Sequence, residues 1–201
     1  MLEIKQFIFG PFQTNTYVVS DEQGVLIIDP ACSCVAEQNE LREYISKLPI
    51  TNYQLQIVAT HGHLDHLWGA RWATEQWHTP VLIPEADIPM VERMQEQYEL
   101  FGISAKAEEF RMKGLEDERI RGFEIIKTPG HTPGSVCLYW PEEKVLFSGD
   151  TLFCMGYGRT DLPGGNMMAL IDSLQRLFEL PTDVRVYPGH GEATTIGEEK
   201  R

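Results

Sequence analysis

Four side chains able to bind metal are concentrated in one short stretch of the sequence. Residues 60–67 read Thr-His-Gly-His-Leu-Asp-His-Leu, which places His61, His63, Asp65 and His66 within six positions. Histidine is the most common metal ligand and carboxylates are common partners. Residues two positions apart on an extended segment can face one ion, while the adjacent Asp-His pair can face a second. The spacing therefore suits two neighbouring metal ions better than one.

The remaining histidines indicate a site assembled from distant parts of the chain, which has only six histidines. His131 and His190 each lie in a Pro-Gly-His turn after an apolar run, and Asp150 ends a third run at Ser-Gly-Asp. Only His78 lacks such a setting, and we interpret it as a surface or core histidine. Chance clustering on a solvated loop would not repeat the order of strand, glycine turn and ligand, so we predict a metal site.

The order of these motifs resembles the metallo-β-lactamase superfamily. The sequence contains His-x-His-x-Asp-His, Pro-Gly-His-Thr-Pro-Gly-Ser, Ser-Gly-Asp-Thr-Leu-Phe and Pro-Gly-His-Gly in that order. Within the superfamily it is most similar to glyoxalase II, the hydroxyacylglutathione hydrolases, and the resemblance extends from residues 14–17 to residues 194–197. The resemblance implies an α/β (α+β) fold, the four-layer αββα sandwich, with the site at the strand ends.

The resemblance also implies a role for each matching residue. His61, His63 and His131 would hold the first metal ion. The second ion would be held by Asp65, His66 and His190, and Asp150 would bridge the two ions. Neutral imidazoles with two carboxylates suit Zn²⁺, which we expect, with Fe²⁺ or Mn²⁺ as alternatives. Two such ions, roughly 3.5 Å apart, lower the pKa of a shared water from ~15.7 towards ~7. We expect the bridging hydroxide to attack a thioester carbonyl, with Asp65 and Asp150 as the catalytic carboxylates.

Hydroxyl groups flank the predicted ligands. Thr60, Thr132 and Ser135 are each within four positions of a ligand histidine. Such hydroxyls either hold an imidazole in one tautomer or satisfy the main chain of a turn. Both interpretations fit the sequence equally well.

The segment after Asp150 departs from typical glyoxalase II. There it reads like Gly-Cys-Gly-Lys-Phe-Tyr, whose Lys and Tyr contact glutathione; here residues 156–165 read Gly-Tyr-Gly-Arg-Thr-Asp-Leu-Pro-Gly-Gly. Arg159 can replace the lysine as an anion-binding cation, but Asp161 would repel a glutathione carboxylate. An Arg159–Asp161 pair that only orders the loop is an equal alternative. The candidate substrate contacts are Arg159, Tyr157 and Cys154, although Cys154 also fits a small buried apolar residue.

Length and charge restrict the organisation and the partners. A chain of 201 residues with 42% apolar composition predicts one domain, residues 1–201. Compared with glyoxalase II, which it resembles, we expect it to have no C-terminal glutathione-binding helical domain. The net charge of −13 argues against nucleic acid as a partner, because such binding needs a basic surface. No apolar run is long enough to span a membrane and no signal peptide is evident, so we expect a cytoplasmic protein with a small-molecule thioester substrate. The sequence indicates no oligomeric state.

Apolar periodicity predicts strands and helices throughout the chain. The predicted strands are 2–9, 16–20, 25–29, 54–60, 80–84, 108–112, 123–127, 135–140, 144–148 and 184–187. The predicted helices are 35–48, stopped by Pro49, 65 to about 77, 85–100, 164–180 and a short helix after Gly191. The methionine and aromatic stripe of residues 90–101 is interpreted as core. The frequent short strands with tight turns over residues 108–148 favour antiparallel sheets.

Other functions fit parts of the same pattern. Persulfide dioxygenases resemble this chain in the His-x-His-x-Asp-His stretch and in a Gly-Arg-Thr-Asp-Phe segment like residues 158–162, and they use a single Fe²⁺ bound by two His and one Asp. An ester or lactone hydrolase, including a β-lactamase, is a more distant alternative. A non-catalytic metal-binding module would not need a complete bridging set with an open position.

Overall fold

The computed structural model describes residues 2–48, 54–115 and 119–200, and the chain divides into two compact units. Unit 1 comprises Met1–Ala59, His63–Ile83 and Ile88–Gly114, and unit 2 comprises Thr60–Gly62, Pro84–Asp87 and Leu115–Arg201. The chain therefore passes from unit 2 into unit 1 inside the His-rich stretch, between Gly62 and His63. The prediction of one domain stays a prediction, and Pro49 lies outside the described residues.

Unit 1 is built on a six-stranded sheet with the order β1-β2-β3-β4-β5-β6. Its strands are β1 (Glu3–Phe9), β2 (Thr14–Asp21), β3 (Gly24–Ile28), β4 (Gln54–Val58), β5 (Val81–Pro84) and β6 (Met112–Leu115). The first three strands are antiparallel, whereas β3 pairs with β4 and β4 with β5 in parallel. These parallel pairs were not predicted from the sequence. A helix connects β3 to β4 and lets both strands run the same way.

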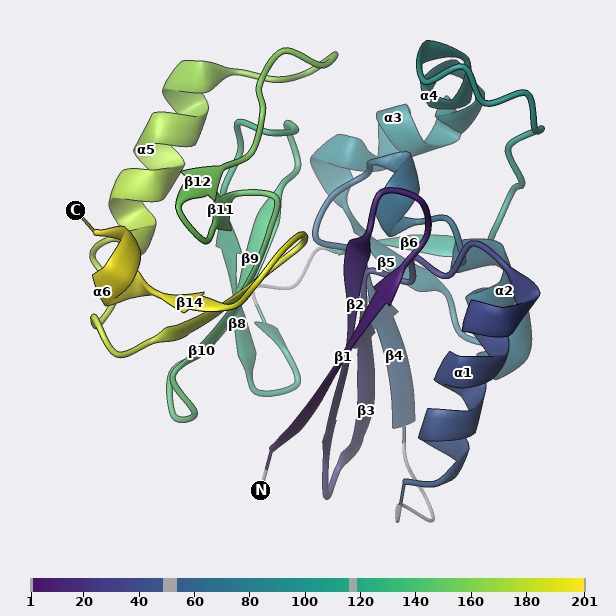
Figure 1. Cartoon of the computed structure of the whole chain (residues 1–201), viewed down its shortest axis with the longest axis horizontal. Helices are drawn as coiled ribbons and strands as arrows, with labels where there is room; N and C mark the ends of the chain where they lie inside the picture. The colour runs from purple at the N-terminus through teal and green to yellow at the C-terminus, as the bar shows by residue number, and fades with distance from the viewer. Residues whose placement is uncertain (1, 49–53, 116–118, 201) are drawn as a thin grey trace. The chain divides into compact units, whose positions relative to one another are not determined.

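That connecting helix, α1 (Val35–Ser46), belongs to the core of unit 1. Its buried residues Leu41 and Ile45 join the apolar cluster that contains Val25 and Ile57 of the sheet. Figure 1 shows α1 beside the strands of this sheet. Burial of one helix face against the sheet supplies most of the stability of such a helix, since short helices are marginal alone.

The remaining helices of unit 1 differ from the predicted ones in their boundaries. They are η1 (Leu64–His66), α2 (Ala70–Trp77), α3 (Ile88–Glu92) and α4 (Met94–Leu100), preceded by η2 (Glu85–Asp87) in unit 2. The single helix predicted over 85–100 is broken at Arg93, whose φ of −103° and ψ of 32° are not helical. Val91, Met94 and Tyr98 are buried in the unit 1 core, which confirms the core interpretation, but Phe101 is exposed. The strand predicted over 108–112 is also wrong, because β6 begins only at Met112.

Unit 2 contains a second six-stranded sheet, with the order β14-β13-β10-β9-β8-β7. Its strands are β7 (Arg119–Ile120), β8 (Phe123–Lys127), β9 (Val136–Trp140), β10 (Val145–Gly149), β13 (Arg185–Pro188) and β14 (Thr194–Thr195), and a separate pair is formed by β11 (Leu152–Phe153) and β12 (Gly156–Tyr157). Neighbouring strands are antiparallel except β10 and β13, which are parallel and are connected through α5 (Met167–Leu177). A short α6 (Ile196–Glu199) follows β14, as predicted for the tail.

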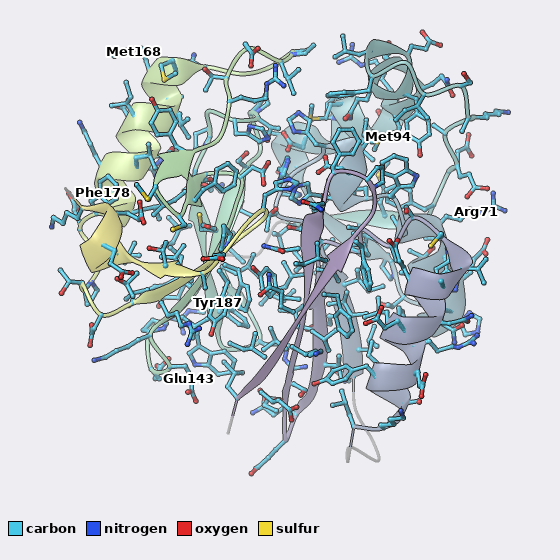
Figure 2. The ribbon with its side chains drawn as sticks, viewed as in Figure 1. Arg71, Met94, Glu143, Met168, Phe178 and Tyr187 are labelled. Carbon is cyan, nitrogen blue, oxygen red and sulfur yellow. The ribbon has the colours of Figure 1, made fainter. Side chains whose placement is uncertain are left out.

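Helix α5 shows how the sequence pattern fixes packing in unit 2. Asn166 caps its first turn by accepting a hydrogen bond from the main-chain nitrogen of Ala169 at 3.1 Å. Its leucines at 170, 174 and 177 are buried in one cluster with strand β13. Figure 2 labels Met168 on the exposed part of α5 and Phe178 at the end of the helix, where Phe178 packs against that cluster.

Each unit is therefore a sheet with its own helices, which confirms the mixed α/β fold class. In the described parts of the chain, no helix has both the length and the apolar character needed to cross a membrane.

Candidate metal centre

Unit 1 presents three predicted ligands on one turn after strand β4. His63 stands at the start of η1, and Asp65 and His66 lie within it. The main-chain nitrogen of Leu64 donates to Oε1 of Gln97 at 3.0 Å, which ties the turn to α4. The local geometry thus follows from the sequence, because three ligands fall within four consecutive residues.

A buried carboxylate orients His66. Its Nδ1 lies 2.9 Å from Oδ2 of Asp29, and both side chains are buried. An ionised carboxylate only accepts hydrogen bonds, so Nδ1 holds the proton and Nε2 keeps the lone pair that binds metals. Sequence reasoning assigned Asp29 only to the end of a strand. The signal available was its place directly after the buried strand β3, where it adopts a φ of 54° that Asp tolerates better than most residues.

A hydroxyl group orients Asp65. Oγ1 of Thr14, at the start of β2, donates to Oδ2 of Asp65 at 2.8 Å. The same Oδ2 lies 3.4 Å from Nε2 of His66. This separation is longer than a good hydrogen bond, which is ~2.7–3.2 Å.

Unit 2 collects four predicted ligands from separate segments. His61 lies in the segment Thr60–Gly62, and the other three follow strands β8, β10 and β13 as His131, Asp150 and His190. The main-chain nitrogen of Val136 donates to the carbonyl of Thr60 at 2.9 Å, which attaches the first segment to β9. Because β8, β9, β10 and β13 are successive strands of one sheet, residues far apart in sequence meet at its edge.

Two of these histidines converge on a single carboxylate oxygen. Nε2 of His131 and Nε2 of His190 each lie 3.5 Å from Oδ2 of Asp150. The rings of His61 and His131 are 4.8 Å apart in an edge-on arrangement. Two donors on one tetrahedral zinc ion, with bonds of ~2.0–2.1 Å, are about 3.3–3.4 Å apart. The distances in both units therefore fit donors that share an ion, and unit 2 contains a His/Asp cluster suited to a divalent metal.

The main chain orients His131. Its Nδ1 donates to the carbonyl oxygen of Arg159 at 2.7 Å, which again leaves Nε2 for a metal. This contact needs a close approach of the loop, and Gly158 provides it. A Cβ at Gly158 would lie 1.9 Å from the carbonyl oxygen of Asp150 and 3.1 Å from Nδ1 of His131. Any larger residue would have to displace the ligand-bearing main chain.

The flanking hydroxyl groups divide between the two interpretations. Oγ1 of Thr60 lies 3.1 Å from Nδ1 of its neighbour His61. Thr132 and Ser135 instead hydrogen bond to each other at 2.7 Å, and Ser135 accepts from the main-chain nitrogen of Thr132, so both satisfy a turn. Thr132 also donates to a buried carboxylate, Asp87, at 2.7 Å. Asp87 was not identified from the sequence, because nothing in residues 84–90 marks it as more than a polar helix start.

The predicted substrate contacts all lie in the segment after β10, with Tyr157 in the short strand β12. Cys154 and Tyr157 are exposed, so the interpretation of Cys154 as a buried apolar residue is wrong. Nε and Nη2 of Arg159 donate to the two carboxylate oxygens of Asp161 at 2.6 and 2.7 Å. This hydrogen-bonded pair lowers the pKa of Asp161 to about 2, so the carboxylate stays ionised and balances the guanidinium. The predicted Arg159–Asp161 pair is therefore present, whereas its role in ordering the loop stays a prediction. His78, outside the motifs, is exposed at the end of α2.

Comparisons with known proteins agree with this arrangement. Residues 9–190 match the Metallo-beta-lactamase superfamily. The chain is 37% identical to the hydroxyacylglutathione hydrolase GloC of Haemophilus influenzae, over 94% of this chain and 91% of that protein. It is 34% identical to the probable metallo-hydrolase YqgX of Bacillus subtilis, over 93% and 89%. The solved structure of TTHA1623 in a di-iron-bound form is 36% identical, with a TM-score of 0.86 over 98% of this chain and 97% of that chain.

Proposed function

The chain belongs to the metallo-β-lactamase superfamily, and on that premise we propose that it is a thioesterase of the hydroxyacylglutathione hydrolase type. The observation that carries the proposal is the convergence of His131 and His190 on one oxygen of Asp150. A carboxylate oxygen between two imidazole nitrogens is the arrangement expected of a ligand that bridges two ions. The similarity to GloC supports a thioester as the substrate.

We infer that seven residues hold two divalent ions. They are the seven residues of the sequence motifs, namely His61, His63, Asp65, His66, His131, Asp150 and His190. Zinc fits these nitrogen and oxygen donors, and iron is equally compatible, as the di-iron form of the similar TTHA1623 illustrates. Two ions bound there would lower the pKa of a shared water to ~7, which makes a nucleophile available at neutral pH.

The protein side chains then have defined tasks. Asp29 keeps the proton on Nδ1 of His66, and the carbonyl of Arg159 does the same for His131. Both imidazoles are thereby fixed in the tautomer that binds a metal through Nε2. Thr14 holds Asp65 in one orientation. Such preorganisation matters because a ligand that must rotate before binding weakens the site.

We propose a small-molecule thioester as substrate, approached through the loop of residues 154–161. The charge of Arg159 is balanced by Asp161, so this loop offers a neutral pair rather than a single cation. A thioester whose thiol moiety does not have to be recognised through carboxylates therefore fits this segment better than a substrate that must contain glutathione. Tyr157, with 56% of its surface exposed, is available for apolar contact with the substrate.

The test is the release of thiol from S-D-lactoylglutathione by zinc-loaded or iron-loaded protein. We expect turnover in the native chain and in the control variant Asp172→Asn, whose carboxylate is exposed on α5. His190→Ala should lose at least about a thousandfold, because metal catalysis contributes several kcal/mol to such reactions. Equal activity of His190→Ala and the native chain would contradict the proposal, as would a fully metallated native chain that cleaves no thioester.

One alternative has a specific observation in its favour. The Gly-Arg-Thr-Asp segment, residues 158–161, contains the hydrogen-bonded Arg159–Asp161 pair, and this segment resembles that of persulfide dioxygenases. Such an enzyme would bind one iron per chain and consume oxygen with glutathione persulfide. Oxygen uptake at an iron-to-protein ratio near one, without thioester cleavage, would favour it over the thioesterase.

A further inference from the structure

Asp87 is a fully buried carboxylate with three hydrogen-bond donors around it. Its Oδ2 accepts from the main-chain nitrogen of Gly62 at 2.8 Å and from Oγ1 of Thr132 at 2.7 Å. Its Oδ1 accepts from the main-chain nitrogen of Gly134 at 2.6 Å. Burial raises the pKa of this carboxyl, while the bonds from Thr132, Gly62 and Gly134 act in the opposite direction. An ion this deeply buried is retained only with such partners.

The donors around Asp87 belong to the segments that carry two predicted ligands. Gly62 stands between His61 and His63 in the chain, and Thr132 directly follows His131. One carboxylate thus connects the histidine segment Thr60–Gly62 to the turn after β8. Both segments and Asp87 itself belong to unit 2, which brings all three together from separate parts of the sequence.

The turn is shaped to receive this carboxylate. A Cβ at Gly134 would lie 2.6 Å from Cγ and 2.7 Å from Oδ1 of Asp87, closer than real Cβ atoms approach. Ser135 supports the same turn through its hydroxyl contact with Thr132. Asp87 therefore packs closely against Gly134, where no larger residue fits, and accepts hydrogen bonds from the same turn.

We propose that Asp87 is a positioning residue for the first metal ion alone, the ion assigned to His61, His63 and His131. This inference rests on the proposed function, because it presupposes two ions with separate ligand sets. Asp87 fixes the main chain on both sides of that site and touches neither ion nor substrate. The second set, which contains Asp65, His66 and His190, has its own support from Asp29 and Thr14 in unit 1.

Asp87→Asn is the appropriate variant because it preserves shape while removing one acceptor. An amide has one oxygen and one NH₂ group, so it cannot accept from both Gly62 and Gly134. The hydroxyl of Thr132 can turn towards Ser135, but a main-chain N–H cannot turn. One of the two glycine nitrogens must then face the NH₂ group, and the segment that carries it must shift.

The experiment measures zinc affinity in two single-site backgrounds by competition with a chromophoric chelator. His190→Ala removes a ligand of the second site, and His131→Ala removes a ligand of the first. We expect Asp87→Asn to weaken zinc binding by about 10–100-fold in the His190→Ala background, the usual effect of losing a supporting group. In the His131→Ala background the same substitution should change affinity by less than about twofold. Asp172→Asn, an identical chemical change on the exposed face of α5, should have no effect in either background.

Selectivity separates positioning from general stability. A purely structural Asp87 would weaken both backgrounds equally, in step with loss of thermal stability of the metal-free chain, and this outcome would overturn the inference. Unchanged affinity in the His190→Ala background would overturn it as well. In the otherwise native chain, we expect excess zinc to restore kcat of Asp87→Asn with KM unchanged. Because chelator competition needs no substrate, a chain inactive on thioesters would contradict the proposed function while leaving the selectivity of Asp87 measurable.

Discussion

The two units fix their candidate ligands in opposite ways. Unit 1 takes three ligands from one turn, residues 63–66, and orients them with side chains, as Asp29 does for His66. Unit 2 takes four ligands from four segments and orients His131 through the main-chain carbonyl of Arg159. The turn in unit 1 is local and its supports can be removed by single substitutions. The four ligands of unit 2 come together only when its sheet is formed. One of their supports is a main-chain carbonyl, which a side-chain substitution does not remove.

The largest effect is expected at the point where unit 2 depends on one side chain. Asp150→Ala removes the oxygen that lies 3.5 Å from both His131 and His190. If this oxygen bridges two ions, both sites weaken together and thioester turnover falls by at least about a thousandfold. Metal content after dialysis and thiol release measure the two consequences.

A matched control makes this result informative. Asp172→Asn and Asp172→Ala change an exposed carboxylate on α5 and should leave metal content and turnover unchanged. Retention of one tightly bound ion by Asp150→Ala would show that the oxygen belongs to one site only. The two predicted metal sites would then share no ligand.

A smaller effect is expected for the side-chain support in unit 1. Asp29→Asn keeps the volume of the residue but turns a strong acceptor for Nδ1 of His66 into a weaker one. Loss of such a supporting carboxylate typically costs ~10–100-fold in metal affinity or activity. Zinc titration in the His131→Ala background should reveal the loss, whereas the His190→Ala background should not. Equal losses in both backgrounds would show that Asp29 supports the fold rather than one site.

The same contrast explains how much could be predicted from the sequence. The turn of unit 1 was predictable because its ligands are neighbours, and strand endings such as β10 before Asp150 followed from apolar runs and glycine turns. The main helix of unit 2 was recognised from its apolar spacing, although its ends differ by a few residues. Helix 85–100 was predicted as continuous because apolar periodicity persists through Arg93, where the backbone leaves the helical region.

Supporting residues were harder to identify because their role depends on contacts distant in sequence. Asp29 and Asp87 are separated from their partners by 37 and up to 47 residues, so no local spacing relates them. The parallel pairing of β3 with β4 was also not predicted, because two strands separated by a helix carry no local signal of the direction in which they pair. A sequence pattern shows which side chains are suited to bind metal. Tertiary packing decides which other residues hold those side chains in place.

The free energy of unfolding at alkaline pH should depend on one buried thiol in each unit. Burial raises the pKa of Cys32 in unit 1 from 9.0 to about 12 and that of Cys137 in unit 2 to about 11. Above pH 9 the unfolded chain loses these protons while the folded chain keeps them, so the free energy of unfolding falls as pH rises. Each thiol contributes up to about 1.4 kcal/mol per pH unit.

Denaturant titrations between pH 8 and 10.5 measure this slope. We expect Cys32→Ala and Cys137→Ala each to flatten the alkaline decrease relative to the native chain. Both thiols stay protonated in the folded chain over this range, because the pKa values of about 12 and about 11 lie above it, so the two variants should flatten the slope to a similar extent. Unchanged slopes in both variants would show that other groups cause the alkaline loss.

The smallest effect is expected where unit 2 relies on main chain. Arg159→Ala removes the guanidinium and its pair with Asp161 but keeps the carbonyl that accepts from Nδ1 of His131. Zinc affinity in the His190→Ala background should therefore stay within about twofold, whereas the pKa of Asp161 should rise from about 2 towards 3.8 once its partner is gone. A tenfold loss of zinc affinity would mean that the exposed Arg159–Asp161 pair holds the loop in place. In that case unit 2 would depend on a side-chain support as directly as unit 1 depends on Asp29.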